Sequence, residues 1–142
     1  MTTVNTQNQA KEAIYARFIA AWGSETPYVF GNEAYTPPAG AGGAAGSWVR
    51  LTVREAIAAQ NTLGPAGARK FRRRGTILLM VYALADKGEQ RADAIVKKFR
   101  DTFEGVSFDG VNGFTCQVVE HGNEGAWFRV NALQTFDFYE TK

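Results

Sequence analysis

Cys116 and His121 are the only cysteine and histidine in the chain, so their spacing is the first test for side-chain chemistry. A catalytic Cys–His pair needs the two side chains within hydrogen-bonding distance, with a third group to orient the base. Here they lie five positions apart in a segment with strand periodicity, which places them on opposite faces. A tetrahedral site built on His and Cys needs more ligands than the chain contains. We therefore expect a buried Cys116, an exposed His121 and no metal ion.

The carboxylates give no clear catalytic pair either. The acids considered for such a pair stand at a predicted helix end and in turns: Asp101, Glu104, Asp109, Glu120 and Glu124. Acid–base catalysis by two carboxylates requires environments that drive their pKa values apart, and nothing in the sequence marks such a pair. We expect no enzymatic activity.

One glycine-rich stretch, Gly40–Ala45, matches the G-x-G-x-x-A pattern of dinucleotide-binding proteins. That pattern binds a pyrophosphate only where the glycines connect a strand to the N-terminus of a helix. In this chain two prolines precede it and a strand-like segment follows it. We therefore predict a flexible loop over about residues 31–47, and no cofactor.

A cluster of basic residues is the one feature that calls for a functional explanation. Between positions 50 and 74 there are seven cations and one acid, a balance of +6 in a chain whose formal net charge is +2. These candidate interface residues are Arg50, Arg54, Arg69, Lys70, Arg72, Arg73 and Arg74. Such a cluster can be a solvated strand end, a protein interface rich in Arg–carboxylate pairs, or a nucleic-acid surface.

The spacing within this cluster predicts its geometry. On a strand, Lys70, Arg72 and Arg74 share one face, and Arg69, Phe71 and Arg73 share the other. Unpaired charges on both faces cannot be buried in a monomer core. We therefore expect this strand end to extend beyond the layer of helices, and to lie at an interface.

Two helices are indicated by apolar residues at helical spacing. The first covers residues 7–22, with Ile14, Phe18 and Ala21 in its stripe and Gly23 after its end. The second ends before Gly105 and begins near a possible capping box of Asp86 and Glu89. Its stripe consists of Ala92, Ile95, Val96, Phe99 and Phe103.

The remaining elements are strands. Tyr28–Phe30 is a short candidate, residues 48–54 alternate at period two, and residues 70–84 form a long, mostly apolar central strand. Residues 114–119 and 126–139 form a hairpin, with Phe114, Cys116 and Val118 on one face. The predicted fold is α+β: an antiparallel sheet of four to five strands with two helices packed on it, in the order α-β-β-β-α-β-β.

The composition of the chain fits a single soluble domain. The chain has 142 residues, 45% hydrophobic and 13% aromatic, which suits one domain over residues 1–142. Its longest apolar run is too short for a membrane span, and its N-terminal residues show no signal-peptide pattern. We expect a soluble protein made in a reducing compartment. The predicted core is Phe18, Leu79, Val81, Ile95, Phe99, Phe128, Val130 and Phe136.

Several segments, taken in order, resemble the tail terminator-like proteins of bacteriophages with long non-contractile tails. The matching segments span most of the chain: Ile14–Trp22, Thr36–Pro38, Trp48–Val53, Arg72–Val81, Ala92–Phe99 and Trp127–Asn131. The resemblance implies a structural virion protein, made in the host bacterial cytoplasm, that forms a ring, typically of six copies, on the head-proximal end of the tail tube. Its implied partners are further copies of itself, the tail-tube protein and the neck or connector, with DNA only as it passes through the lumen.

Two alternatives remain open from the sequence. One is another neck component, such as a head-completion or head–tail joining protein, which needs the same kind of ring interface. The other is a small nucleic-acid-binding module that uses the basic patch from Arg50 to Arg74. Salt-dependent DNA binding favours this second alternative, whereas ring formation without DNA affinity favours the terminator.

Overall fold

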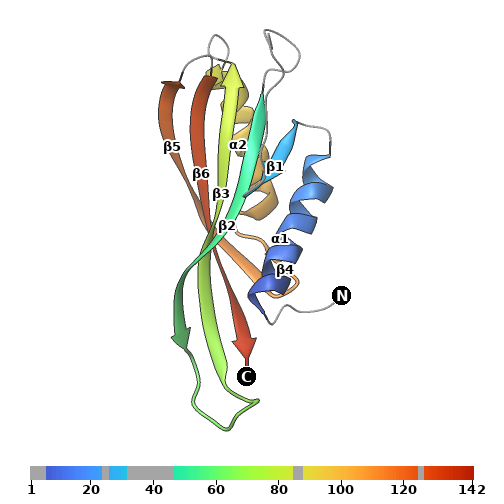
Figure 1. Ribbon diagram of the computed structural model, residues 1–142, viewed down its shortest axis with the longest axis vertical. Coiled ribbons are helices and arrows are strands. Elements are labelled where there is room, and N and C mark those ends of the chain that lie inside the picture. The colour runs from blue at the N-terminus through green and yellow to red at the C-terminus, as the bar shows by residue number, and fades with distance from the viewer. Residues whose placement is uncertain (1–5, 24–25, 32–46, 85–87, 125–126) are drawn as a thin grey trace.

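The computed structural model describes residues 6–23, 26–31, 47–84, 88–124 and 127–142. The elements, in chain order, are α1 (Gln7–Trp22), β1 (Tyr28–Phe30), β2 (Trp48–Gln60), β3 (Lys70–Leu84), α2 (Gly88–Phe103), β4 (Ser107–Phe108), β5 (Val111–Glu124) and β6 (Trp127–Thr141). The architecture is α+β, with two helices and one six-stranded sheet (Figure 1). Most of the predicted flexible loop at 31–47 lies outside the described residues, which include only Gly31 and Ser47 of it. The predicted capping box of Asp86 and Glu89 also lies outside the residues whose side chains are described.

The sheet is mixed, so the prediction of a purely antiparallel sheet of four to five strands is wrong. Its strand order is β1-β2-β3-β6-β5-β4, and only β1 is parallel to its neighbour. A parallel pair needs a long connection, and residues 31–47 are long enough to carry the chain from the end of β1 back to the start of β2. Strand β4 was not predicted as a strand, because its two residues are too few to show a periodic pattern.

Helix α1 forms where its end signals and its apolar stripe agree. Thr6 and Gln9 make a reciprocal capping box at its start, and Gly23 ends it with a positive φ of 54°. Its buried residues recur every fourth position: Ala10, Ile14, Phe18 and Trp22. Ala21, which was expected in this stripe, is exposed.

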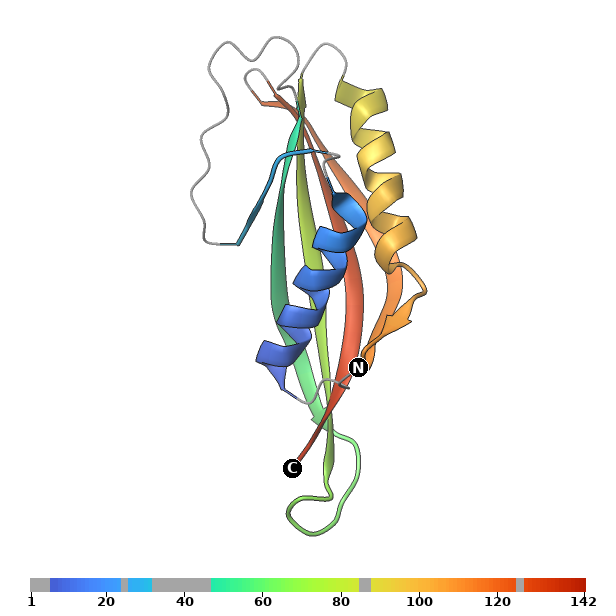
Figure 2. The same ribbon diagram turned by 90° about the vertical axis from the view of Figure 1, so that its right-hand side faces the viewer.

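Both helices cover the same side of the sheet, and the core lies between the two layers (Figure 2). The stripe of α2 is buried, with Phe99 and Phe103 both fully inaccessible. From the sheet, alternate residues of the central strands enter this core, as in the register pairs Leu51–Leu79 and Leu79–Ala132. The predicted core residues are confirmed as buried, except that Phe128 is half-buried and packs at the edge of the core.

A long β-hairpin extends past the N-terminal end of α1, together with the C-terminal end of β6 (Figure 2). Strand β2 continues to Gln60, six residues beyond its predicted end, and residues 61–69 form the tip that connects it to β3. The backbones of Arg69 and Lys142 bond to each other in both directions, at 2.8 and 3.3 Å. We call residues 55–74 and 139–142 the β-arm.

Candidate interaction surface

The side of the sheet that carries no helix, called here the open face, holds most of the predicted basic residues. Strand alternation and register place Arg50 and Arg54 of β2 there, with Lys70, Arg72 and Arg74 of β3. Arg73 points to the opposite side, which carries the helices. The predicted division of the cluster between two faces is therefore confirmed, and so is its position on a projecting strand end.

Arg72 forms an ion pair with a buried carboxylate of its own chain. Its Nε lies 2.6 Å from Oδ2 of Asp137, whose side chain is 3% exposed. Asn112 Nδ2 donates to the other carboxylate oxygen at 3.0 Å. The Arg72 guanidinium also lies 5.9 Å from the ring centre of Phe114. This pair joins β3, β6 and β5, so Arg72 has a structural role whatever else it contacts.

Arg73 is likewise paired within the chain. One of its terminal nitrogens lies 2.7 Å from Oε1 of Glu140, and the other lies 3.7 Å from Oε1 of Glu55. All three side chains are about a quarter exposed or less. The Arg–carboxylate pairing expected with another chain is thus satisfied internally for two of the seven predicted residues.

At the other end of the open face, arginines alternate with aromatic rings. The rings of Trp48 and Tyr82 stack with centres 4.2 Å apart. Arg50 lies over Trp48 and donates to the Gly31 carbonyl oxygen at 3.0 Å. Arg129 lies over Tyr82, with its centre 5.6 Å from the ring. The β3–β6 register places Arg129 on the same surface as Arg50.

Three cations of the open face are exposed: Arg54, Lys70 and Arg74. Within the described part of the chain, none of their side chains forms an ion pair or hydrogen bond. Arg69, at the tip of the β-arm, is half-buried, and its Nε has no partner among the described residues. These side chains are available to a partner.

The β-arm also exposes apolar side chains. Leu63, at its tip, is 90% exposed, and Ile57, beside Arg74 in the register, is 59% exposed. The outer edge of β2 from Val53 to Gln60 pairs with no other described strand, because β1 ends opposite Leu51. An unpaired edge next to exposed apolar groups is a typical feature of an assembly surface.

Cys116 and His121 lie on opposite faces of the sheet, whereas Oε2 of Glu104 accepts a hydrogen bond of 2.7 Å from the Cys116 backbone N–H. Burial raises the pKa of the Cys116 thiol above its ordinary value of 9.0. His121 is exposed and lies 3.0 Å from the Asn131 amide. A β-bulge between Gly113 and Cys116 also alters the predicted face, since it leaves Phe114 beside Arg72 while Cys116 enters the core. Among the described residues, no three His, Cys, Asp or Glu side chains are grouped to hold a metal ion.

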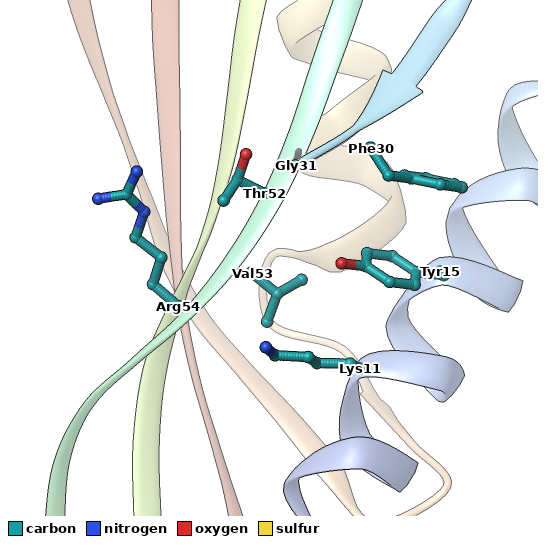
Figure 3. A pocket seen from close by; sticks show the side chains of 7 residues that line it. All are labelled: Lys11, Tyr15, Phe30, Gly31, Thr52, Val53 and Arg54. Carbon is teal, nitrogen blue, oxygen red and sulfur yellow. The ribbon is translucent and has the colours of Figure 1, made fainter. Parts of the chain in front are cut away.

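A shallow pocket lies where β1 ends beside β2 (Figure 3). Lys11 and Tyr15 of α1 lie on one side of β2, whereas the Arg54 side chain extends on the other. The polar side chains that line this pocket therefore do not converge on one ligand position. The lining residues are Lys11, Tyr15, Phe30, Gly31, Thr52, Val53 and Arg54.

Comparisons with known proteins establish the fold but not a family. Neither a protein-family model nor a curated protein matches the sequence. A solved structure whose name carries no function is similar, with a TM-score of 0.65 and 20% identity over 94% of this chain and 95% of that chain. Within the described residues, neither helix is long and apolar enough to cross a lipid bilayer.

Proposed function

We propose that this chain is the subunit of a ring that caps the head-proximal end of a phage tail tube, ends its polymerisation and joins the tail to the neck. The main support for this proposal is the β-arm, which exposes Ile57 and Leu63 and whose end extends past the helices (Figure 2). In an isolated subunit, Leu63 at the end of the hairpin is 90% exposed and adds no burial free energy to the fold. Burying one such side chain in a partner contributes about 1.5–3 kcal/mol.

The β-arm is suited to contact a neighbouring subunit or the tube in two ways. Its tip supplies the apolar Leu63 with Arg69 nearby, and the edge of β2 that pairs with no other described strand supplies backbone donors and acceptors. Arg72 and Arg73 hold the β-arm in shape through Asp137, Glu55 and Glu140. A preformed arm loses less entropy on binding than a flexible one, which favours repeated assembly of identical contacts.

The mass of the assembled species, alone and with tail-tube protein, tests this proposal. We expect a ring, typically of six 15.5 kDa subunits, either alone or on the tube end. The Ile57→Ser/Leu63→Ser double variant should remain monomeric and folded. Ile19→Ser is the matched control, because Ile19 is 44% exposed but lies on α1 away from the β-arm. Equal assembly by the double variant and by the wild type would refute a role for the β-arm.

A head-completion or head–tail joining protein requires the same kind of ring and is the second candidate. The two functions differ in the binding partner. A terminator binds tube ends made of tail-tube protein, whereas a joining protein binds the connector and leaves tube length unchanged.

A further inference from the structure

The open face is strongly basic over its whole length. Register places six cations on it, and the one described carboxylate there, Asp137, is buried and paired with Arg72. The cations are Arg50, Arg54, Lys70, Arg72, Arg74 and Arg129. The excess of positive charge is thus a property of one surface and not only of one sequence segment.

The helical side of the molecule has no such excess. Outside the open face, the described side chains include nine cations and eight carboxylates, and on α2 Lys97 is paired with Asp101 at 2.8 Å. On the helical side of the β-arm, Arg73 faces Glu55 and Glu140. A partner selected by charge therefore approaches the open face.

The positive charges form an extended array and not a compact cluster. Arg129 pairs in register with Tyr82, and Lys70 lies twelve residues away along β3, about 40 Å at strand spacing. Carboxylates on a folded protein occur at scattered positions, whereas the backbone of duplex DNA carries charge at regular intervals over such a length. The array therefore matches a regular polyanion better than an acidic protein.

The contacts within the face indicate which part of the nucleic acid is bound. Trp48 is only 7% exposed and is stacked on Tyr82, so this pair is not available to stack on bases. Arg50 and Arg129 are held against these rings, and Arg72 is held by Asp137. The side chains of Arg54, Lys70 and Arg74 are exposed beside these fixed arginines. Such an arrangement is suited to contacts with phosphates, which carry no sequence information.

We propose that the open face binds the phosphate backbone of duplex DNA without sequence specificity. The inference rests on the proposed function, because a ring through which DNA passes would present this face to the lumen, with the helices outside. Under this inference, DNA affinity no longer separates a terminator from a nucleic-acid-binding module, and ring formation is the property that does. It assigns the basic surface to DNA and leaves the tip of the β-arm and the outer edge of β2 for protein contacts, with Ile57, opposite Arg74, at the boundary between the two.

Fluorescence anisotropy of labelled 30-base-pair DNA duplexes, titrated with the full-length protein at several NaCl concentrations, tests the inference. The test variant is Arg54→Gln/Lys70→Gln/Arg74→Gln, whose wild-type side chains are exposed and form no ion pair among the described residues. The matched control is Lys11→Gln/Lys97→Gln/Lys98→Gln, which removes the same number of charges from the two helices. The wild type should bind at low salt, with an affinity that falls steeply as salt rises.

The test variant should lose at least about tenfold in affinity, and its salt slope should fall by about 3, near one per removed cation. The control should stay within about twofold of the wild type. Equal losses in both variants would overturn the inference, as would no binding by the wild type at low salt. Poly-glutamate that binds as tightly as DNA would overturn it in favour of an acidic protein. Normal tube capping without DNA binding would refute this inference alone, whereas DNA binding without rings would refute the proposed function alone.

Discussion

Nε of Arg72 lies 2.6 Å from Oδ2 of Asp137, and the aspartate side chain is almost fully buried although it stands next to the projecting β-arm. The pair crosses from β3 to β6, and Asn112 of β5 adds a hydrogen bond to the same carboxylate. Arg72 therefore differs from Arg74, its neighbour on the same face, which is exposed and forms no ion pair with the described residues. Two arginines that are equivalent in the sequence have different roles.

The first prediction concerns this difference. Arg72→Ala should lower the free energy of unfolding by about 3 kcal/mol, because it leaves the buried Asp137 carboxylate without its cation. Arg74→Ala should change it by no more than about 0.5 kcal/mol. Urea denaturation of both variants measures this, and equal effects would show that the Arg72–Asp137 pair contributes little. Charge reversal at Arg72 is consequently a poor probe of assembly, since it also destabilises the subunit.

The second prediction concerns the docking of α2 on the sheet. Phe99 is fully buried, and its ring centre lies 5.3 Å from that of Phe103. Phe99→Ala should cost about 3–5 kcal/mol, because the surrounding core cannot close around the space left by the ring. Thermal and denaturant unfolding measure the loss, and a value below about 1 kcal/mol would contradict the packing.

The third prediction concerns the close approach of β5 to the end of α2. A Cβ at Gly113 would collide with the backbone carbonyl of Phe103 and would lie 3.1 Å from the Val106 carbonyl oxygen. Gly113→Ala should therefore destabilise the fold by about 3 kcal/mol or more, since backbone cannot yield as a side chain does. Gly31→Ala is the control, because a Cβ there meets nothing within 4 Å. Similar unfolding midpoints for the two variants would contradict this close contact.

The fourth prediction concerns the buried thiol. Burial raises the pKa of Cys116 above 9.0, so the folded protein keeps its proton at a pH where the unfolded chain begins to lose it. The free energy of unfolding should therefore fall as the pH rises through about 9, and this part of the fall should disappear in Cys116→Ala. Alkylation by iodoacetamide at pH 9 should be at least about tenfold slower in the native protein than in denaturant. Equal alkylation rates would show that the thiol is accessible.

The sequence predicts the helices and the central strand well because their signals are local. α1 was predicted with its observed bounds, because its apolar stripe is regular and Gly23 follows its end, whereas the Thr6–Gln9 capping box at its start was not recognised from the sequence. The long apolar run of β3 likewise identified the central strand. The parallel pairing of β1 could not be predicted, because it depends on the path of a seventeen-residue connection and not on the three residues of the strand.

The candidate surface was predicted only in part. Period-two spacing correctly separated Arg73 from Arg72 and Arg74. It could not reveal that Arg72 pairs with Asp137 and Arg73 with Glu140, because these carboxylates lie more than sixty positions away along the chain. Arg129 was missed for the same reason, since only the β3–β6 register places it in line with the other cations. The bulge at residues 113–116 reversed the expected side of Phe114, because one extra residue shifts the alternation of a strand.

The length of tail tubes assembled from the cognate tube protein, measured by electron microscopy with and without this protein, tests the central claim most directly. The proposal predicts that the wild-type protein stops elongation and forms a ring at one tube end. The Ile57→Ser/Leu63→Ser variant should leave tubes growing as they do without any addition, and Ile19→Ser should act like the wild type. Tubes that lengthen equally in the presence of the folded wild-type protein would contradict the claim.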